Sequence, residues 1–316
     1  MATYLLRRLG HAITVIAVVS TLTFVIVHLA PGGPAVLADP KLGTAERLEL
    51  EHQLGLDRPL PQQYAVWVAR AVRGDLGRSF LYESSNLDAI LERLPNTLLL
   101  AGVSLLLSIL VAVPLGAVSA SRPGSRLDRL LSVVSFTSMA IPTFWLGIAA
   151  IFVCAVLLHV LPAGGAATVG AAPSAIDRVR HLVLPAFVLS AALSAELFRY
   201  TRATAAATLK QPFVRTARAK GSTRVAVVWH GLRNAMIPVV TVIGLQLPRL
   251  VGGAAITETV FAWPGLGRLG VEAALGRDYP LVMAITLFVS AAVVLVNILV
   301  DLLYVWADPR IRLAGP

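Results

Sequence analysis

The stretch LGHAITVIAVVSTLTFVIVHLA, residues Leu9 to Ala30, contains 22 residues and no Asp, Glu, Lys or Arg. In an α-helix that rises about 1.5 Å per residue, it is long enough to cross a hydrocarbon layer about 30 Å thick. Arg7 and Arg8 precede it, as in a signal peptide, but the run is too long and no Ala-x-Ala cleavage pattern follows. The sequence predicts an uncleaved transmembrane helix here.

The rest of the chain has a similar character, with 57% hydrophobic and only 14% charged residues among 316, which excludes an ordinary soluble domain. The run from Leu130 to Ile176 is too long for one crossing, and Leu161-Pro-Ala-Gly-Gly165 is expected to end a helix that begins near Ser132. We predict an all-α integral membrane protein with six transmembrane helices. The five after the first are Leu94 to Ser121, Ser132 to Leu161, His181 to Ala195 and beyond, Asn234 to Thr257, and Pro280 to Val300.

The positions of the basic residues predict the orientation, because cytoplasmic loops hold the excess of Lys and Arg. With the N-terminus inside, the inner segments hold 15 of the 27 basic residues. The loop from Pro31 to Arg93 has seven basic and nine acidic residues, as an exported loop can have. We therefore expect both termini in the cytoplasm. The net charge of +10 is attributed to this topology and to anionic membrane lipid, and not to nucleic-acid binding.

The exported loop, residues 31–93, is long enough to form a small extracytoplasmic domain between the first two transmembrane helices. Thr44 can cap a short helix that Gly55 ends. Pro61 can lie in the first turn of a second helix, which Gly74 ends. The loop is thus expected to contain two short helices.

The second of these helices has an apolar face, because Tyr64, Trp67, Val68 and Ala71 are spaced at i, i+3, i+4 and i+7. One interpretation is a cap packed on the outer ends of the membrane helices. The other is a surface that docks an external partner, for which Tyr64, Trp67 and Asp75 are the candidate residues.

The motifs of catalysis are weak or missing. Gly265-Leu-Gly-Arg-Leu-Gly270 has the spacing of a dinucleotide-binding motif, but no strand is expected before it. The sequence contains no P-loop, a single cysteine, Cys154, and six scattered His. We predict no catalytic residue, no metal site and no cofactor in this chain.

Ionisable groups near the bilayer are costly unless they are paired or face a cavity. Glu196 has Arg199 one turn away as a partner, and Asp301 follows the last span. Arg249 lies in the outer half of the fifth span with no acid within one helical turn, so it faces either an aqueous pathway or a structural partner. Arg249 and Glu258 are the candidate residues of a translocation pathway.

A basic segment, FVRTARAKGSTRVAVVWHGLRNAMIP, occupies Phe213 to Pro238 and contains four Arg, one Lys and no acid. Pro212 can start a helix, Gly221 can end it, and Ser222 can cap a second helix. The segment is then either an amphipathic hairpin on the lipid surface or a cationic knob that fits a partner's socket. The apolar face of the second helix would contain Val225, Val228, Trp229 and Leu232.

These residues carry a resemblance. The chain resembles, over nearly its whole length, the membrane permease subunits of bacterial ATP-binding-cassette importers for dipeptides, oligopeptides and nickel. Arg215-Thr-Ala217 stands at the Glu-Ala-Ala of the family's coupling loop and Gly221 at its Gly, while Leu232-Arg-Asn234 replaces Leu-Pro, as in the peptide and nickel branch. Further matching motifs are Leu29-Ala-Pro-Gly32, Leu54-Gly-Leu-Asp-Arg-Pro59, Gly74-Asp-Leu-Gly77, Glu258-Thr-Val-Phe261, Pro264-Gly-Leu-Gly267, Arg277-Asp-Tyr-Pro280 and Asp308-Pro-Arg310.

The resemblance implies a type I importer permease in the bacterial inner membrane. Residues 1–30 would be the N-terminal tail and first helix, residues 31–93 the receptor-docking domain, and residues 94–316 the permease core. The cytoplasmic coupling loop would be residues 208–234. Its contacts with an ATPase would be made by Phe213, Arg215, Thr216, Ala217, Arg218, Ala219, Lys220 and Gly221.

The resemblance also implies partners: a second, similar permease, two cytoplasmic ATPases that bind ATP and Mg, and an extracytoplasmic substrate-binding protein. Peptides are favoured over nickel as the substrate, because no cluster of His, Cys or Asp suits a metal. An ion-coupled secondary transporter would ordinarily show inverted repeats and paired acids, and a membrane-embedded hydrolase would need a nucleophile with its base. The sequence shows none of these, so both alternatives are disfavoured.

Overall fold

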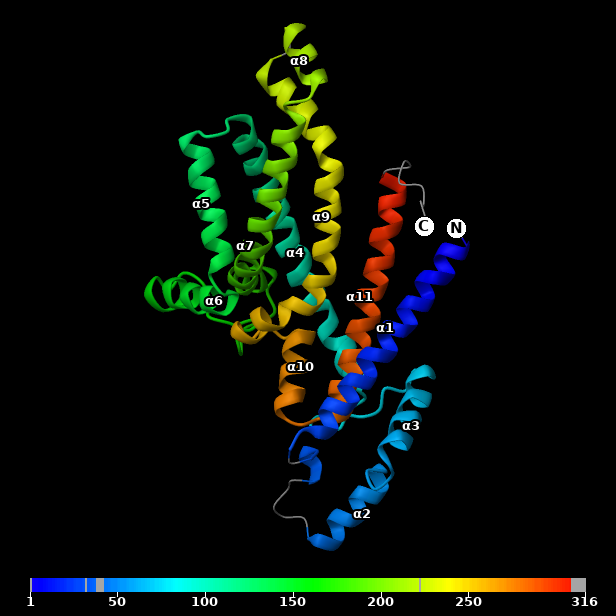
Figure 1. Ribbon diagram of the computed structural model, residues 1–316. Coiled ribbons are helices and arrows are strands. Elements are labelled where there is room, and N and C mark those ends of the chain that lie inside the picture. The colour runs from blue at the N-terminus through cyan, green and yellow to red at the C-terminus, as the bar shows by residue number, and fades with distance from the viewer. Residues whose placement is uncertain (1, 32, 38–42, 222, 308–316) are drawn as a thin grey trace. The chain divides into compact units, whose positions relative to one another are not determined.

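The computed structural model describes residues 2–31, 33–37, 43–221 and 223–307. Within these ranges, the side chains of residues 2–7, 35, 218, 224, 225, 227, 228, 230–238, 249, 251–253 and 303–307 lie outside the description. All the regular elements in the described part are helical (Figure 1). They are α1 (Ala2–Leu29), η1 (Ala35–Leu37), α2 (Thr44–Leu54), α3 (Leu60–Val72), α4 (Asn86–Ser121), α5 (Arg126–Ala140), α6 (Thr143–Ile151), η2 (Phe152–Leu157), α7 (Ala175–Thr208), α8 (Pro212–Ala219), α9 (Arg224–Val260), α10 (Leu266–Leu275) and α11 (Tyr279–Ala307).

Four of the described helices, α1, α4, α7 and α11, are long and apolar enough to cross a membrane. The pair formed by α5 with α6 and η2 is a fifth candidate, because its two parts are apolar but bent by 100°. In α9 the described apolar part is the shorter segment Val239–Pro248. The all-helical membrane fold is thus confirmed, and the count of six crossings stays a prediction.

The third predicted span differs from the expected single helix between Ser132 and Leu161. α5 ends at Ala140, Ile141 is extended with φ −82° and ψ 122°, and α6 begins after Pro142. A proline ring disfavours the helical conformation of the residue before it and removes a hydrogen-bond donor. The signal for this break, Ile141-Pro142, was present in the sequence and was overlooked.

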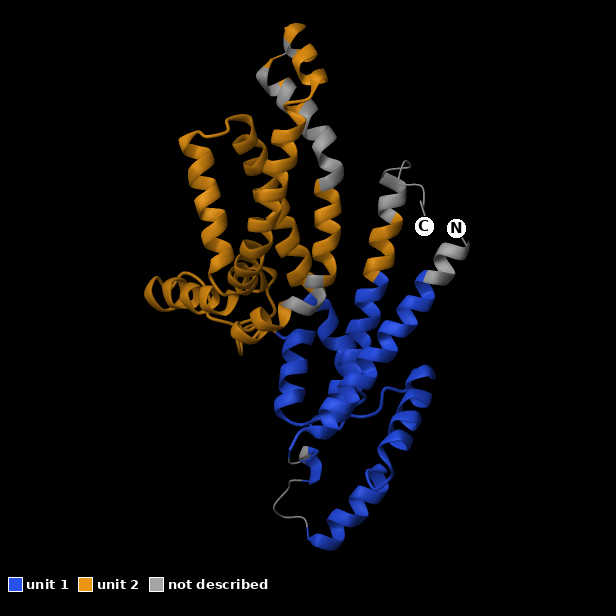
Figure 2. Ribbon diagram, viewed as in Figure 1, with its two compact units in different colours: residues 1–97, 264–295 blue, residues 98–263, 296–316 orange. Residues whose placement is uncertain are grey.

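The chain divides into two compact units (Figure 2). Unit 1 contains residues 1–97 and 264–295, and unit 2 contains residues 98–263 and 296–316. Two of the three boundaries fall inside long helices, α4 and α11, and the third lies between α9 and α10. The functional division at residues 30 and 93 stays a prediction.

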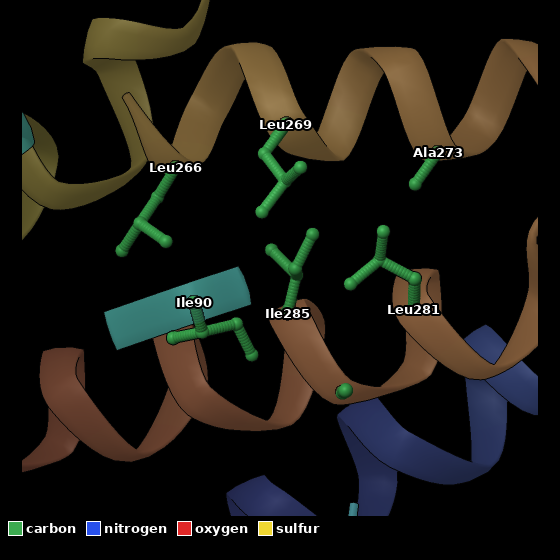
Figure 3. Packing of buried hydrophobic residues seen from close by; sticks show 7 residues of the cluster. Ile90, Leu266, Leu269, Ala273, Leu281 and Ile285 are labelled. Carbon is green, nitrogen blue, oxygen red and sulfur yellow. The ribbon is translucent and has the colours of Figure 1, made fainter. Parts of the chain in front are cut away.

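The core of unit 1 forms where α10 packs against α11 and the start of α4 (Figure 3). Leu266, Leu269 and Ala273 lie on one face of α10, since they are spaced by three and four residues. The Leu266 N–H donates to Thr97 Oγ1 at 2.8 Å, and Asn96 Nδ2 donates to the Pro264 carbonyl at 3.0 Å. The cluster is completed by Ile90, Leu281, Ala284 and Ile285.

The core of unit 2 forms around α7, which runs beside α9 and also contacts α5 and α6 (Figure 1). Two thirds of the apolar window of α7 is buried, 67%, against 17–22% for α1, α4 and α11. Among the described residues, most of the apolar windows of α1, α4 and α11 is therefore not buried. One close approach is at Gly116, where an added Cβ would lie 2.8 Å from Thr201.

Candidate functional site

The two short helices of the outer loop, α2 and α3, form as the sequence predicts. Gly55 has φ 69° and ends α2. The N-cap of α2 is Gly43, one residue before the predicted Thr44, because Gly43 has the extended backbone and its N–H donates to the Glu46 carboxylate at 2.9 Å.

The ends of α3 also match the prediction. Pro61 lies in its first turn. After the last turn, Gly74 has φ 84°, its N–H donates to the Ala71 carbonyl at 3.0 Å, and the Asp75 N–H donates to the Arg70 carbonyl at 3.1 Å. Two such bonds around a left-handed glycine form a Schellman motif, which satisfies carbonyls that the helix end leaves free.

The predicted apolar face of α3 packs on α1. The Tyr64 hydroxyl lies 2.8 Å from Ser20 Oγ and 2.9 Å from Thr21 Oγ1. The ring of Tyr64 lies 5.2 Å from that of Phe24 and 6.1 Å from that of Trp67, between centroids. This face is therefore turned inward within unit 1, in agreement with the first interpretation of the loop.

The ring contacts continue from α1 to the start of α11. His28 lies 4.0 Å from Phe24 and 5.7 Å from Tyr279, between centroids. The His28 ring nitrogens face the Phe24 carbonyl at 2.8 Å and Gln63 Oε1 at 3.3 Å. We call the rings of Trp67, Tyr64, Phe24, His28 and Tyr279 the aromatic row; it joins α3, α1 and α11.

A pocket of about 730 Å³ adjoins the aromatic row in unit 1, and we call it the outer pocket. Trp67 and Asp75, two of the three candidate docking residues, line it, while Tyr64 is used in packing against α1. The Asp75 carboxylate accepts from the Gly77 N–H at 2.9 Å, so it is turned toward its own loop.

The segment after α3 is fixed to α11 by Asp278, which is fully buried. One oxygen of its carboxylate accepts from Ser79 Oγ at 2.5 Å and from the Leu81 N–H at 3.0 Å. The other accepts from the Leu281 N–H at 3.2 Å, as an N-cap of α11 does. Sequence reasoning missed this residue, although Asp followed two positions later by Pro280 is a helix-start pattern.

A tyrosine near this contact is also held by a carboxylate. The Tyr82 hydroxyl donates to Glu272 at 3.2 Å. Partial burial and the Glu272 carboxylate raise the pKa of Tyr82 above its ordinary value, so the hydroxyl keeps its proton and remains a donor.

In unit 2, α8 and the start of α9 form the predicted pair of helices, which we call the elbow. Gly221 has φ 80° and follows α8, as predicted. The N-cap of α9 is Thr223, whose hydroxyl accepts from the Ala226 N–H at 3.3 Å. The predicted cap, Ser222, lies outside the described residues, as do the side chains of Arg218, Val225, Val228 and Leu232.

Most described side chains of α8 face away from the protein. Val214 is buried and serves as its anchor, whereas Phe213 is 42% exposed. Trp229, in the first turns of α9, is 69% exposed. The other described positions of the candidate coupling set are exposed Arg215, Thr216, Ala219, Lys220 and Gly221 and half-buried Ala217.

A partly buried ion pair in unit 2 ties the first turn of α5 to α7, which leads into the elbow. Arg202 Nε and Nη2 donate to the two oxygens of Asp128 at 2.6 and 2.9 Å, a bidentate geometry. Asp128 also accepts from Ser119 Oγ and from the Gly124 N–H. Sequence reasoning did not single out Asp128, although the Ser125-x-x-Asp128 spacing is the signal of a capped helix.

Of the two candidate pathway residues, only Glu258 has a described side chain. Glu258 is fully buried near the end of α9, where its carbonyl accepts from the Trp263 N–H at 2.8 Å. The side chain of Arg249 lies outside the described residues. Among the residues that are described, no three His, Cys, Asp or Glu side chains gather as metal ligands would.

Comparison with known proteins decides the family. Residues 112–313 match the family described as "Binding-protein-dependent transport system inner membrane component", and residues 1–101 match its N-terminal region. The chain belongs to this family. It is therefore a multi-pass permease of the ATP-binding-cassette transport class, as the resemblance implied, and not a secondary transporter.

Relatives of this permease match it from end to end. The oligopeptide transport system permease protein AppB of Bacillus subtilis is 43% identical over 99% of this chain and 100% of its own length. The dipeptide transport system permease protein DppB of Escherichia coli is 37% identical over 99% of both chains. Among solved structures, the inward-facing MetNI methionine transporter aligns with 70% of this permease and 97% of its own chain, with a TM-score of 0.57 and 21% identity. That likeness concerns the fold alone.

Proposed function

We propose that this permease forms, together with a second, similar permease, the membrane pathway of an ATP-driven importer of short peptides. The observation that carries the proposal is its end-to-end similarity to permeases of oligopeptide and dipeptide systems. Two cytoplasmic ATPases would bind ATP and Mg, and an extracytoplasmic substrate-binding protein would deliver the peptide. Nickel import is the weaker alternative.

The elbow is proposed to be the contact with an ATPase, with both termini on the same cytoplasmic side. An isolated helix as short as α8 is marginal in water, so it needs tertiary or partner contacts. In the described residues, its packing partner is α9 and its buried anchor is Val214. The exposed cations Arg215 and Lys220 are then available to a socket on another subunit.

Coupling would follow from the connection of the elbow to α7 and α9. When the ATPases close on ATP, α8 would move as part of a rigid lever, and the membrane helices would exchange inward-open for outward-open arrangements. Gly221 is suited to the corner of this lever, because its backbone has a positive φ. Arg249 and Glu258 remain the proposed pathway residues.

The outer domain is proposed to dock the substrate-binding protein through the surface near Trp67 and Asp75. The packing of Tyr64 on α1 supports this role, since it gives that surface a rigid base. The loop of residues 31–93 is also longer than a connection between two helices requires, and a docking role would account for its length.

The proposal is tested with the full complex in proteoliposomes. We expect uptake of a labelled dipeptide that requires ATP in the vesicle lumen, on the ATPase side, and that persists in the presence of an uncoupler. Uptake driven by an ion gradient without ATP would contradict the proposal. Uptake of Ni²⁺ in place of the dipeptide would keep the ATP-driven mechanism and replace the substrate.

A further inference from the structure

The outer pocket has the size of a small-molecule site, since such sites enclose about 300–1,000 Å³. Its walls come from α1, the end of α2, α3, the segment after Gly74 and the start of α11, all in unit 1. One side is apolar and aromatic. The residues of that side are Phe24, Trp67, Phe80, Tyr279 and Met283.

Two residues of this side hold polar atoms with no partner. Tyr279 is 9% exposed, and its hydroxyl has no hydrogen-bond partner among the described residues. Trp67 Nε1 is likewise buried and unsatisfied within the described part of the chain. Buried polar groups are normally hydrogen-bonded, and both atoms are closed to solvent here, so an acceptor in the pocket reaches them only when a side chain of the lining shifts.

The charged residues of the pocket lining are mostly cationic. They are Arg58, Arg70 and Arg78 against one acid, Asp75, which already accepts from the Gly77 N–H. Arg78 donates to the Glu83 carbonyl. The guanidinium groups of Arg58 and Arg70, by contrast, have no hydrogen bond and no ion pair within 4 Å among the described residues.

The acid next to Arg58 in the sequence is engaged elsewhere. Asp57 is hydrogen-bonded to His52 Nδ1 at 2.8 Å, and this bond lowers the pKa of Asp57, so it stays ionised and bound to His52. Within the described residues, the contact of Arg58 with Asp57 is a longer-range electrostatic one. Two guanidinium groups remain available to a ligand.

Arginine forks and aromatic residues in the lining together suit a carboxylate next to a large apolar group. We propose that the outer pocket binds the C-terminal end of a short peptide, with the carboxylate at Arg58 and Arg70 and the last side chain against the aromatic row. The inference rests on the proposed function, because it takes the transported class as the ligand. It places a peptide site on the permease itself, in the outer domain.

The test uses the assembled transporter in phosphatidylcholine nanodiscs, without substrate-binding protein or nucleotide, and measures equilibrium binding of labelled Ala-Phe. We expect saturable binding that weakens about tenfold or more for Ala-Phe amide, which lacks the carboxylate. Arg58→Ala with Arg70→Ala is expected to weaken Ala-Phe binding by a similar factor and to abolish the preference for the free acid. Arg47→Ala is the matched control, since Arg47 is an exposed arginine of α2 that pairs with Glu51 and does not line the pocket.

Tyr279→Phe separates a binding role from a structural one. Removing an unsatisfied buried hydroxyl is expected to leave the Tm of the complex unchanged or higher, whereas it removes a donor to the ligand and weakens Ala-Phe binding about threefold or more. Unchanged binding in both Tyr279→Phe and the double arginine variant overturns the proposal. So does equal affinity for Ala-Phe and its amide.

A lipid phosphate is the other anion of suitable chemistry. The measurement is repeated in nanodiscs with added phosphatidylglycerol. If phosphatidylglycerol binds to the unmodified pocket, is lost in the double arginine variant and is not displaced by Ala-Phe, the pocket is a lipid site and the proposal is wrong. The two proposals can also fail separately. ATP-driven uptake of Ala-Phe with no receptor-free binding overturns the pocket alone, whereas binding without any ATP-driven uptake overturns the proposed function.

Discussion

Asp278 in unit 1 and Asp128 in unit 2 are both buried carboxylates that tie a connecting segment to a long helix, but their partners differ. Asp278 is satisfied by neutral donors, a serine hydroxyl and two backbone N–H groups. Asp128 is paired with a guanidinium in addition to its neutral donors. A buried carboxylate that is stabilised by several neutral donors loses a small part of this stabilisation when one donor is removed. A carboxylate paired with a counter-ion loses most of its stabilisation when the counter-ion is removed.

The largest effect is therefore expected at Arg202. Arg202→Ala leaves the Asp128 carboxylate, whose side chain is 4% exposed, without its counter-ion. We expect a loss of about 3 kcal/mol of stability, at the lower end for buried pairs because Arg202 itself is 36% exposed. Thermal unfolding of the purified complex measures it. The control is Arg126→Ala, an exposed arginine of the same turn, and equal unfolding temperatures of the two variants would contradict this account.

A smaller effect is expected at Asp278. Asp278→Asn keeps the shape but replaces one acceptor oxygen by a donor, which leaves buried donors of the clamp unsatisfied. We expect a loss of about 2 kcal/mol. Amide hydrogen exchange sharpens the comparison, because the Leu81 and Leu281 N–H groups should exchange faster while the Gly124 N–H, bonded to Asp128, should not change. Unaltered exchange at Leu81 would show that the clamp does not depend on the charge.

The next effect concerns backbone strain rather than charge. Gly221→Ala places a Cβ at φ 80° and is expected to cost about 1–2 kcal/mol locally, although no atom obstructs the Cβ. Gly102→Ala, in the middle of α4 with open space around it, is the matched control and should be neutral or slightly stabilising. ATPase activity of the complex should become uncoupled from transport only in the first variant. Normal coupling of ATPase activity to transport in Gly221→Ala would show that Gly221 is not part of the lever.

The smallest effect on stability is expected at the exposed cations of the elbow. Arg215→Glu with Lys220→Glu should change the unfolding temperature of the isolated permease hardly at all, since exposed charges contribute about 0–1 kcal/mol. The same variant should lose association with the ATPase subunits, measured by co-purification. Retained ATPases would return the elbow to a lipid-surface hairpin.

The sequence was a good guide wherever the signal is local. Gly55, Gly74 and Gly221 end helices as predicted, because a left-handed turn selects glycine whatever surrounds it. The inward face of α3 followed from the spacing of Tyr64 and Trp67, since side chains three and four residues apart share one side of a helix.

The contacts that fix the loops could not be read in the same way. Ser79 and Asp278 are 199 residues apart in the sequence, and Asp128 and Arg202 are 74 apart. Only the tertiary arrangement of helices brings such partners together, and one sequence does not contain it. The outer pocket has the same origin, because its cations and its aromatic wall come from separate helices. The coupling and pathway residues were proposed from resemblance and stay predictions.

The break at Ile141 and Pro142 also has a geometric consequence. The fifteen residues of α6 and η2 form an arm about 20 Å long, attached to α5 through two extended residues, Ile141 and Pro142. A torsional change of about 10° at this connection would displace the far end of the arm by about 4 Å. A Cβ added at Gly147 would lie 2.9 Å from Val260, so α6 already packs closely against the end of α9 at this position. Any rotation of α6 in that direction must therefore carry the end of α9 with it.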